Sequence, residues 1–479
     1  MSFDSASNWT LRPLGECIDL IIDHRGKTPR KLGSDWVDSG VPTISAKNVS
    51  GGKLVAKESI RFVSHDIYKK WMKEDVRKGD CLLVSEGATL GECLYWDEDY
   101  PVVLGQRIFC IRANPEILNP RYLYAYMTSE AFQQEIRSRA TGSSVPGLRQ
   151  TEVLKLMVLA PPLDEQAIIG DTLFSVNEKI KSNTKTNQTL EQIAQAIFKS
   201  WFVDFEPAKA KIAALEAGGS EEGALFAAMQ AISDKGEEEL TRLHAEQPEQ
   251  YAELRATAEL FPSAMQDSEL GEIPDGWTVG TLADVANLNQ QSWTKRTIPS
   301  EIRYVDLANT KNGVIESTTT YLSDDTPSRA RRILSNGDTI VGTVRPGNRS
   351  FAFIKRPQKT LTGSTGFAVL SPKQAELAEF VYITATSDAT INHLAHLADG
   401  GAYPAVRPEV VINLPCIVPN ERLIAYFHKT VRSFFDQAAV HKLESSTLSV
   451  LRDMLLPKLL SGELSVLATD DQLAGPANV

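Results

Sequence analysis

The chain lacks the short motifs that mark most nucleotide-dependent and hydrolytic enzymes. Gly51-Gly52-Lys53 is not a Walker A loop, because the earlier glycine and the Ser or Thr after the lysine are missing. No G-x-G-x-x-G opens a helix after a strand, and neither G-x-S-x-G nor H-E-x-x-H occurs. We therefore assign the sequence no catalytic, cofactor-binding or metal-binding residue.

Cysteine and histidine are scarce and do not cluster. The chain has five cysteines and seven histidines, and none has the spacing of a metal site. His393 and His396 lie three positions apart, and we expect both on the exposed face of a helix. An odd number of cysteines, mostly in apolar runs, indicates reduced thiols of the interior and a cytoplasmic protein.

Long hydrophobic runs are missing as well. No stretch approaches the roughly 18–20 apolar residues that cross a bilayer. The first residues lack the basic, apolar and small-residue order of a secretory signal. We expect no membrane partner.

The net charge of −11 is unevenly distributed. Residues 9–160 contain 21 Lys and Arg against 19 Asp and Glu, and residues 277–418 contain 14 against 12. Residues 161–270 contain 9 against 20, which equals the whole negative excess. An acidic balance normally argues against nucleic-acid binding. Here the acidity lies in the middle segment, so the two slightly positive flanking segments remain candidates for DNA binding.

The chain contains a two-fold internal repeat. Residues 78–161 match residues 336–419 at a constant offset of 258 positions without a gap, so that Gly105 corresponds to Gly363 and Tyr124 to Tyr382. A repeat of this length indicates two similar modules that perform one task at two places, for example on two half-sites.

Each repeat is predicted to be a compact α+β domain. Short β-like runs punctuated by Gly, Asn, Asp and Pro are followed by a helical stretch, a Gly-rich turn and a last apolar run. The first helical stretch begins at Asn119-Pro120, where asparagine suits the cap and proline the first turn. The predicted divisions are a first domain at 9–163, a long helix at 164–212, an acidic helical linker at 213–270, a second domain at 271–420, a second long helix at 421–466 and a disordered tail at 467–479.

The long helix after each repeat has regular apolar spacing. The spacing alternates between four and three residues, as along the seam of a coiled coil. The seam positions are Ile169, Leu173, Val176, Ile180, Asn183, Asn187 and Leu190 in the first helix, and Phe427, Val431, Phe434, His441, Ser445 and Leu448 in the second. Polar residues at the middle of both seams predict an antiparallel pair whose buried polar layer fixes the register. The alternative is two separate amphipathic helices, each packed on its own domain.

Both repeats carry polar loops suited to a polyanion. Basic, amide and hydroxyl side chains read base edges and hold phosphates. The candidates are Arg25, Lys27, Arg30, Lys31, Gln106, Arg107, Ser143, Ser144 and Arg149 in the first repeat, and Lys295, Arg296, Arg345, Arg349, Ser364, Tyr403 and Arg407 in the second. Singly, each is more typical of an ordinary surface loop. Similar loop positions with different side chains are what two different half-sites require.

Several longer strings resemble the specificity subunit of type I restriction–modification systems. They are Val145–Gln150, Pro161–Gln166, Ile197–Lys211, Gly271–Pro274 and Leu451–Leu464, and the resemblance covers residues 9–466. The resemblance implies two target-recognition domains, each reading half of a bipartite sequence in double-stranded DNA. It also implies that the two long helices form an antiparallel coiled-coil spacer of fixed length.

The resemblance further implies the partners. Two modification subunits would hold S-adenosylmethionine and methylate adenine, and restriction motor–nuclease subunits would join them for cleavage. This chain would then be non-catalytic and hold no cofactor, in agreement with the missing motifs. The acidic stretch at 213–265 is longer than the resemblance leads one to expect between the halves.

Two other classes of protein could have this layout, a self-sufficient enzyme and a scaffold. A self-sufficient methyltransferase, alone or fused to a nuclease, needs its own cofactor loop, which the sequence does not show. The alternative is a pseudo-symmetric scaffold without DNA contact, because an excess of two positive charges per repeat is small. A steep loss of DNA affinity with salt would exclude the scaffold.

Overall fold

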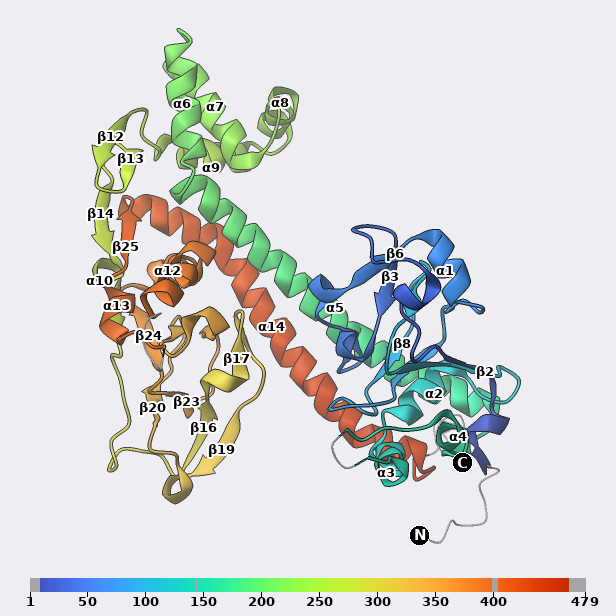
Figure 1. The fold of residues 1–479 in the computed structure, drawn as a ribbon. Coiled ribbons are helices and arrows are strands. Elements are labelled where there is room, and N and C mark those ends of the chain that lie inside the picture. The colour runs from blue at the N-terminus through green and yellow to red at the C-terminus, as the bar shows by residue number, and fades with distance from the viewer. Residues whose placement is uncertain (1–8, 143–144, 399–403, 465–479) are drawn as a thin grey trace, which may run out of the picture. The chain divides into compact units, whose positions relative to one another are not determined.

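The computed structural model describes residues 9–142, 145–398 and 404–464. The chain divides into two compact units, residues 1–182 with 444–479 and residues 183–443 (Figure 1). The division falls within both long helices, so each unit contains one α+β domain and about half of each helix. The predicted tail at 467–479 lies outside the described residues.

The first unit contains two sheets. A four-stranded antiparallel sheet has the order β2–β10–β7–β8, and a three-stranded sheet has the order β6–β3–β9, with β3 and β9 parallel. The strands are β1 Thr10–Pro13, β2 Ile18–Asp23, β3 Val41–Ile44, β4 Val49–Ser50, β5 Lys53–Leu54, β6 Arg61–Val63, β7 Cys81–Val84, β8 Cys93–Tyr95, β9 Val103–Leu104, β10 Ile108–Ala113 and β11 Met157–Ala160. The helices are α1 His65–Trp71, α2 Pro120–Met127, α3 Glu130–Arg139 and α4 Gln150–Val153, with 3-10 turns η1 Leu14–Glu16, η2 Arg30–Leu32, η3 Ala46–Asn48 and η4 Lys57–Ser59.

Local sequence explains where the first helix pair begins and ends. Asn119 caps α2, since its side chain accepts hydrogen bonds from the amides of Arg121 and Tyr122, and Pro120 occupies the first turn. Ser129 caps α3 in the same way, so the predicted stretch of residues 120–140 is two helices. All five cysteines are buried and unpaired, as expected for thiols of the interior.

The second unit repeats this plan. Its four-stranded antiparallel sheet β15–β24–β21–β22 corresponds to β2–β10–β7–β8, and β19–β16–β23 corresponds to β6–β3–β9, again with one parallel pair. The strands are β12 Met265–Ser268, β13 Gly271–Pro274, β14 Thr278–Thr281, β15 Ala286–Leu288, β16 Glu301–Val305, β17 Thr310–Lys311, β18 Val314–Ile315, β19 Thr319–Leu322, β20 Ala330–Ile333, β21 Thr339–Gly342, β22 Phe351–Phe353, β23 Leu361–Ser364, β24 Phe367–Pro372 and β25 Pro415–Val418. The helices of this domain are α10 Leu282–Val285, α11 Ala378–Thr386, α12 Asp388–Ala398 and α13 Pro408–Ile412, with η5 Leu307–Asn309, η6 Ser323–Asp325, η7 Pro346–Asn348 and η8 Ala375–Leu377.

The two domains differ in one segment, which lies between β6 and β7 in the first domain and between β19 and β21 in the second. In the first domain this segment forms the helix α1, which packs on the sheet through Ile67 and Trp71. In the second domain it forms a fourth strand, β20, which pairs with β23. The scaffold is therefore shared, and one segment of it is built differently.

The long helices run antiparallel within each unit. They are α5 Leu163–Phe202 and α14 Glu421–Leu460. In the first unit Ile169 and Leu173 share a core with Leu459 and Leu460. In the second unit the core joins an α5 group, Ala194, Phe198 and Trp201, to an α14 group, Phe427 and Val431. The residue numbers of the partners fall as those of α5 rise, which is the direction that the seam predicts.

The seam positions are all buried or half-buried, including the polar ones. Asn183 is 3% exposed, and its amide nitrogen donates to the carbonyl of His441. The side-chain oxygen of Asn187 lies 2.9 Å from Nδ1 of His441, and its nitrogen donates to the carbonyl of Ala438 at 3.2 Å. Because these polar groups are paired only in one register, they resist sliding of the two helices.

The long helices are shorter than the sequence predicts. The first ends at Phe202 rather than 212, because Phe205 adopts a left-handed conformation with φ of 56° and Pro207 begins a new helix, α6 Glu206–Glu216. The second ends at Leu460 rather than 466, and Gly462 follows with φ of 73°.

The segment predicted as an acidic helical linker is a folded module. Three helices, α7 Glu221–Ser233, α8 Glu237–Glu246 and α9 Pro248–Glu259, gather with α6 around a core of their own (Figure 1). The buried members of that core are Leu225, Ala228, Met229, Leu240 and Ala258. Alanine allows close helix contact, so a composition that suggests a linker forms a small core here.

A buried charged cluster joins the second domain to α14. Glu379 on α11 is fully buried, and its carboxylate lies 3.1 Å from Nζ of Lys355 and 2.5 Å from Nδ1 of His428. Lys355 also contacts Asp436 at 3.1 Å. Burial raises the pKa of Asp436, but the hydrogen bonds and charges of Lys355 and Arg432 outweigh it and lower this pKa. The cluster therefore attaches the domain to α14 through opposite charges, each of which would be costly to bury without its partner.

Replacing Lys355 with methionine tests this cluster. We expect a loss of about 3–5 kcal/mol in the free energy of unfolding, because Glu379 then stays buried with only His428 as its partner. The double variant Lys355→Met, Glu379→Gln should recover part of that loss, and Lys373→Met, at an exposed lysine of the same domain, should have little effect. Denaturant unfolding measures all three, and a double variant no more stable than the single one would contradict the pairing.

Candidate nucleic-acid interface

The Gly-rich turn of each domain is held by the same pair of backbone hydrogen bonds. In the first domain the amide of Gly87 donates to the carbonyl of Pro146 at 2.9 Å, and the amide of Leu148 donates to Ser85 at 2.8 Å. The same two bonds recur 258 positions later, from Arg345 to Pro404 at 2.8 Å and from Val406 to Thr343 at 2.9 Å. The Gly-rich turn and the loop that follows β7 or β21 thus form one repeated surface.

Arg149 and Arg407 occupy equivalent places on this surface. Each has extended backbone and immediately precedes a short helix, α4 or α13. Both side chains are exposed, and neither has a hydrogen bond or ion pair within the described part of the chain. Two arginines at the same point of two repeats are well placed for phosphate or base contacts.

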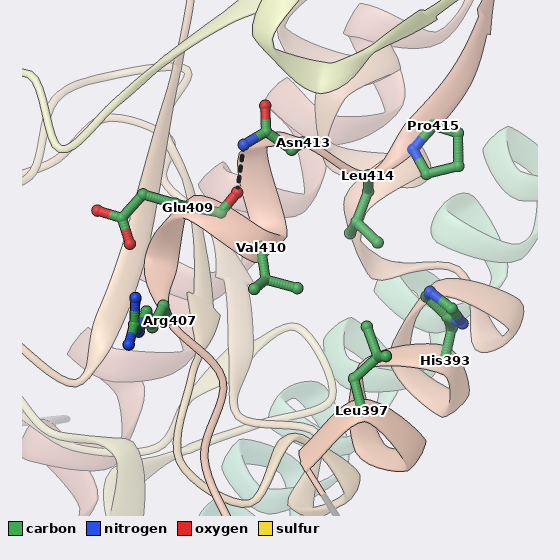
Figure 2. A pocket seen from close by; sticks show the side chains of 8 residues that line it. All are labelled: His393, Leu397, Arg407, Glu409, Val410, Asn413, Leu414 and Pro415. Carbon is green, nitrogen blue, oxygen red and sulfur yellow. Dashed lines mark hydrogen bonds between the residues drawn. The ribbon is translucent and has the colours of Figure 1, made fainter.

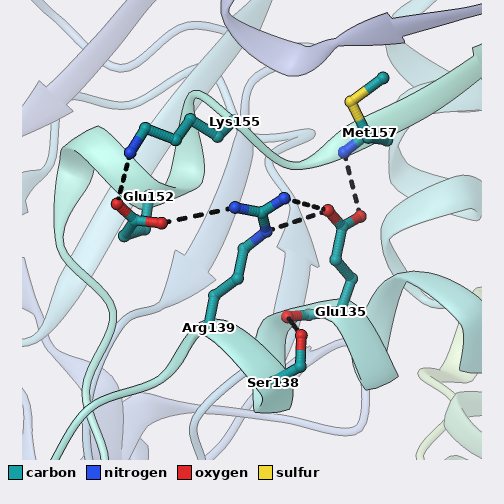
Figure 3. Close-up of polar contacts among 6 residues, drawn as sticks. All are labelled: Glu135, Ser138, Arg139, Glu152, Lys155 and Met157. Carbon is teal, nitrogen blue, oxygen red and sulfur yellow. Dashed lines mark hydrogen bonds and ion pairs between the residues drawn. The ribbon is translucent and has the colours of Figure 1, made fainter.

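A polar network fixes the frame of the first turn (Figure 3). Arg139, at the end of α3, contacts Glu135 at 2.9 Å and Glu152 on α4 at 3.4 Å. Lys155 contacts Glu152 at 2.8 Å, and the other oxygen of Glu135 accepts a hydrogen bond from the amide of Met157. Both sides of the turn are therefore tied to the same carboxylates, which limits the positions available to Arg149.

Three candidate arginines have left-handed backbone, which side chains other than glycine rarely adopt. Their φ angles are 66° at Arg107, 46° at Arg345 and 60° at Arg349. The position equivalent to Arg345 in the first domain is Gly87, with φ of 103°. The scaffold therefore requires this conformation in both domains, and the second domain keeps an arginine there at a conformational cost.

Some predicted contact residues are used inside their own domain. Arg25 binds Asp23 at 2.7 Å, donates to the carbonyl of Leu148 and lies over the Phe109 ring. Lys27 donates to the carbonyl of Trp71 and Lys31 to that of Gly26, both at 2.6 Å.

Two predictions in the second domain meet the same objection. Ser364 is only 2% exposed, and its hydroxyl accepts a hydrogen bond from the amide of Gly366, so the prediction of a DNA contact there is wrong. Arg349 binds Asp388 at 2.5 Å and Asn312 at 2.8 Å, which holds η7 in place. In this loop pattern the sequence does not distinguish structural from available donors.

The other predicted residues remain available for contact. Arg107 is exposed, with Glu86 at 3.7 Å. Those that are exposed and have no side-chain partner among the described residues are Arg30, Gln106, Arg149, Lys295, Arg296, Arg345 and Arg407. Ser143, Ser144 and Tyr403 lie outside the described residues.

Sequence reasoning missed a basic segment in each domain. In the second domain Arg329, Arg331 and Arg332 lie on or next to β20. In the first, Lys69 and Lys70 are exposed on α1, the element at the corresponding place. The run Arg329-Ala330-Arg331-Arg332 is visible in the sequence, but it lies before the gap-free repeat, which begins at residue 336, so the repeat gives it no counterpart.

A cavity of about 440 Å³ lies beside Arg407 (Figure 2). Its lining comes from α12 and from the segment around α13. The lining residues are His393, Leu397, Arg407, Glu409, Val410, Asn413, Leu414 and Pro415. Asn413 donates to the backbone carbonyl of Glu409, so its amide fixes α13.

In the described part of the chain no group of three or more His, Cys, Asp or Glu side chains could hold a metal ion. None of its helices is long and apolar enough to cross a membrane.

Comparisons with known proteins identify the family and the fold. Residues 6–192 match the family described as the type I restriction modification DNA specificity domain. The HindI specificity subunit of Haemophilus influenzae is 31% identical over 409 residues, which cover 82% of this chain and 88% of that protein. The MjaIX specificity subunit of Methanocaldococcus jannaschii is 21% identical over 447 residues, which cover 92% and 90%.

A solved structure has the same fold. The crystal structure of the type I restriction–modification S subunit from M. genitalium superposes with a TM-score of 0.52 at 15% identity, covering 96% of this chain and 98% of that one. The shared fold is that of two α+β domains on a pair of long helices. The chain belongs to the family of type I restriction enzyme specificity subunits. Such subunits recognise DNA and are non-catalytic.

The variant Arg345→Gly separates recognition from folding. Glycine suits the left-handed conformation, so we expect the free energy of unfolding to stay the same or rise by up to about 1 kcal/mol. DNA affinity should fall by about tenfold, the effect of losing one strong arginine contact. Thermal unfolding and a DNA-binding titration measure the two quantities.

Arg356→Gly provides the matched control. Arg356 is also exposed and has left-handed backbone, with φ of 50°. It follows β22, whereas Arg345 and Arg349 precede that strand. We expect the same relief of strain without loss of affinity. Equal DNA affinity of both variants and the unchanged chain would remove Arg345 from the interface.

Proposed function

We propose that this chain reads a bipartite DNA sequence, one half-site with the domain at 9–163 and the other with the domain at 271–420. The observation that carries the proposal is the repeated docking of turn on loop, with unchanged backbone bonds and different side chains. Equivalent positions hold Gly87 and Arg345, or Glu86 and Val344. A shared frame with different side chains suits two half-sites of different sequence.

The proposal includes partner adenine methyltransferase subunits, which S-adenosylmethionine would serve as cofactor, and motor–nuclease subunits for cleavage. The long helices would be the spacer between half-sites and the main partner surface. In the first unit, α14 exposes Val450 at 56%, Leu451 at 44% and Met454 at 59%. A group of exposed apolar side chains on a helix is typical of a protein-binding face. We propose that two modification subunits bind the helix pair.

Methylation mapping tests the proposed function directly. DNA from cells that express this chain with its modification partner is sequenced by a single-molecule method that detects methylated adenine. We expect one new bipartite motif with a fixed gap and an adenine methylated on each strand. A stable complex of the two proteins without any new motif would support the scaffold alternative instead.

The variants Arg149→Ala and Arg407→Ala test the assignment of half-sites. Each should weaken DNA binding by the assembled complex by about 1–3 kcal/mol, because an arginine contact to a base or phosphate is lost. Each should also relax only one half of the motif. Arg242→Ala, at an exposed arginine of α8, removes the same charge from the helical module and should change neither. Identical affinities and motifs for all three variants would exclude both arginines from DNA contact.

A further inference from the structure

A basic ribbon forms one edge of the second domain. The segment Gln291–Trp293 lies antiparallel along β20, with hydrogen bonds from the amide of Trp293 to the carbonyl of Arg331 at 2.8 Å and from Ile333 to Gln291 at 3.2 Å. Ser292 pairs with Arg332. Beyond it, the chain turns at Thr294–Thr297, closed by mutual side-chain and backbone bonds of these two threonines. The turn carries Lys295 and Arg296 at its tip.

Cations gather on this ribbon without matching carboxylates. Five basic residues lie within it, namely Lys295, Arg296, Arg329, Arg331 and Arg332. Within the described part of the chain only Arg329 has an ion pair, a long one of 3.7 Å to Asp306. Lys295, Arg296 and Arg329 are exposed, whereas Arg331 and Arg332 are half-buried. A cluster of cations with few paired carboxylates attracts a polyanion.

Arg332 is held in a state that a bound anion would relieve. Its Nε is buried without a hydrogen-bond partner, while a terminal nitrogen donates to the hydroxyl of Ser292 at 3.1 Å. Burial lowers the pKa of this guanidinium, and the negative charge of Glu409 offsets this only in part. A half-buried cation with an unused donor costs free energy in the unbound chain.

Local geometry directs the neighbouring arginines outwards. Ala330 is fully buried in a cluster with Ile302 and Tyr304, so strand alternation turns Arg329 and Arg331 away from the core. Arg331 is half-buried, and its Nε donates to the carbonyl of Ser328 at 3.1 Å, which leaves its terminal nitrogens for a further contact. The pairing of β20 with β23 is irregular between Ala330 and Arg332, and a bulge of this kind re-aims the side chain it contains. The side chain of Arg329 is 64% exposed.

The ribbon adjoins the repeated turn. The amide of Thr365 donates to the carbonyl of Arg329 at 2.7 Å, and the amide of Thr343 donates to the next residue, Gly366, at 2.9 Å. Thr343 in turn accepts from Val406, the residue before Arg407. A short series of backbone bonds therefore leads from the ribbon to the turn that presents Arg407.

The equivalent segments also meet in the first domain, but with another architecture. Lys27, in the turn after β2, donates to the carbonyl of Trp71 at the end of α1. Burial lowers the pKa of Lys27, and the positive charge of nearby Lys73 lowers it further. The first domain thus gathers basic residues at the same place of the scaffold, on a helix and a turn instead of a ribbon.

We propose that the ribbon, residues 291–296 with Arg329 and β20, lies against the major groove of the half-site read by the second domain, and that Arg329 and Arg331 contact the DNA there. Because β20 is also paired with β23, the ribbon is the outer edge of a sheet, and its side chains would reach the groove. Arginine is the most frequent base-reading residue of the major groove. The proposal rests on the proposed function. It adds the element that binds DNA in this domain and the reason that the two half-sites differ.

The double variant Arg329→Ala, Arg331→Ala tests the ribbon. The full chain, assembled with its modification partner, is titrated by fluorescence anisotropy with a duplex that contains the mapped motif. We expect affinity to fall by at least about tenfold, the loss of one bidentate contact or more. Methylation mapping should show relaxation of one half of the motif and preservation of the other. A second variant, Lys295→Glu with Arg296→Glu, changes only the turn tip, outside any strand, and should lower affinity as well.

Arg242→Ala is the matched control, because Arg242 is exposed in the same unit but lies on α8, outside both the recognition domain and the helix pair. Affinity and motif equal to this control, for both double variants with unchanged thermal unfolding, would overturn the ribbon proposal. A complex of the unchanged chain that yields no motif would instead overturn the proposed function. The two failures are therefore distinguishable.

Discussion

The antiparallel pairing of α5 and α14 is the interaction on which both domains depend. In each unit the core of the α+β domain includes side chains from both helices, such as Leu173 with Leu459, or Phe198 with Phe427. Separating the helices would expose part of each domain's interior, about 1.5–3 kcal/mol per large apolar side chain. The polar pairs of Asn183 and Asn187 with His441 add little stability but restrict the register. Each domain therefore shares its hydrophobic core with the helix pair.

On this frame the two domains keep backbone contacts and change side chains. The bonds that dock the turn recur at a constant offset because they use main-chain groups, which any residue supplies. The segment between β6 and β7 in the first domain, or between β19 and β21 in the second, has no such repeated bonds, and it forms α1 in one domain and β20 in the other. Backbone contacts preserve the scaffold, and this segment is where the two domains differ.

The sequence predicted the repeat, the α+β class and the antiparallel helices well, because these depend on periodic apolar patterns and on a constant offset. It failed where a single conformation decides. The end of α5 depends on the left-handed Phe205, and the module around Leu225 and Ala258 depends on alanine packing that composition does not reveal. Of the candidate contacts, Arg25 and Ser364 lie in suitable loops but serve the domain itself, since partners distant in sequence, or burial, decide their role.

Two features of the candidate interface cost stability in the unbound chain. Arg345 has left-handed backbone where Gly87 suffices in the first domain, and Arg332 has an unused buried donor. Each is unfavourable by itself, by roughly 1–3 kcal/mol for a strained backbone or an unsatisfied donor. On the proposed function, phosphates and base edges would supply the missing acceptors and negative charge. The same groups would then destabilise the free subunit and favour its DNA-bound state, so DNA should stabilise the second domain by mass action.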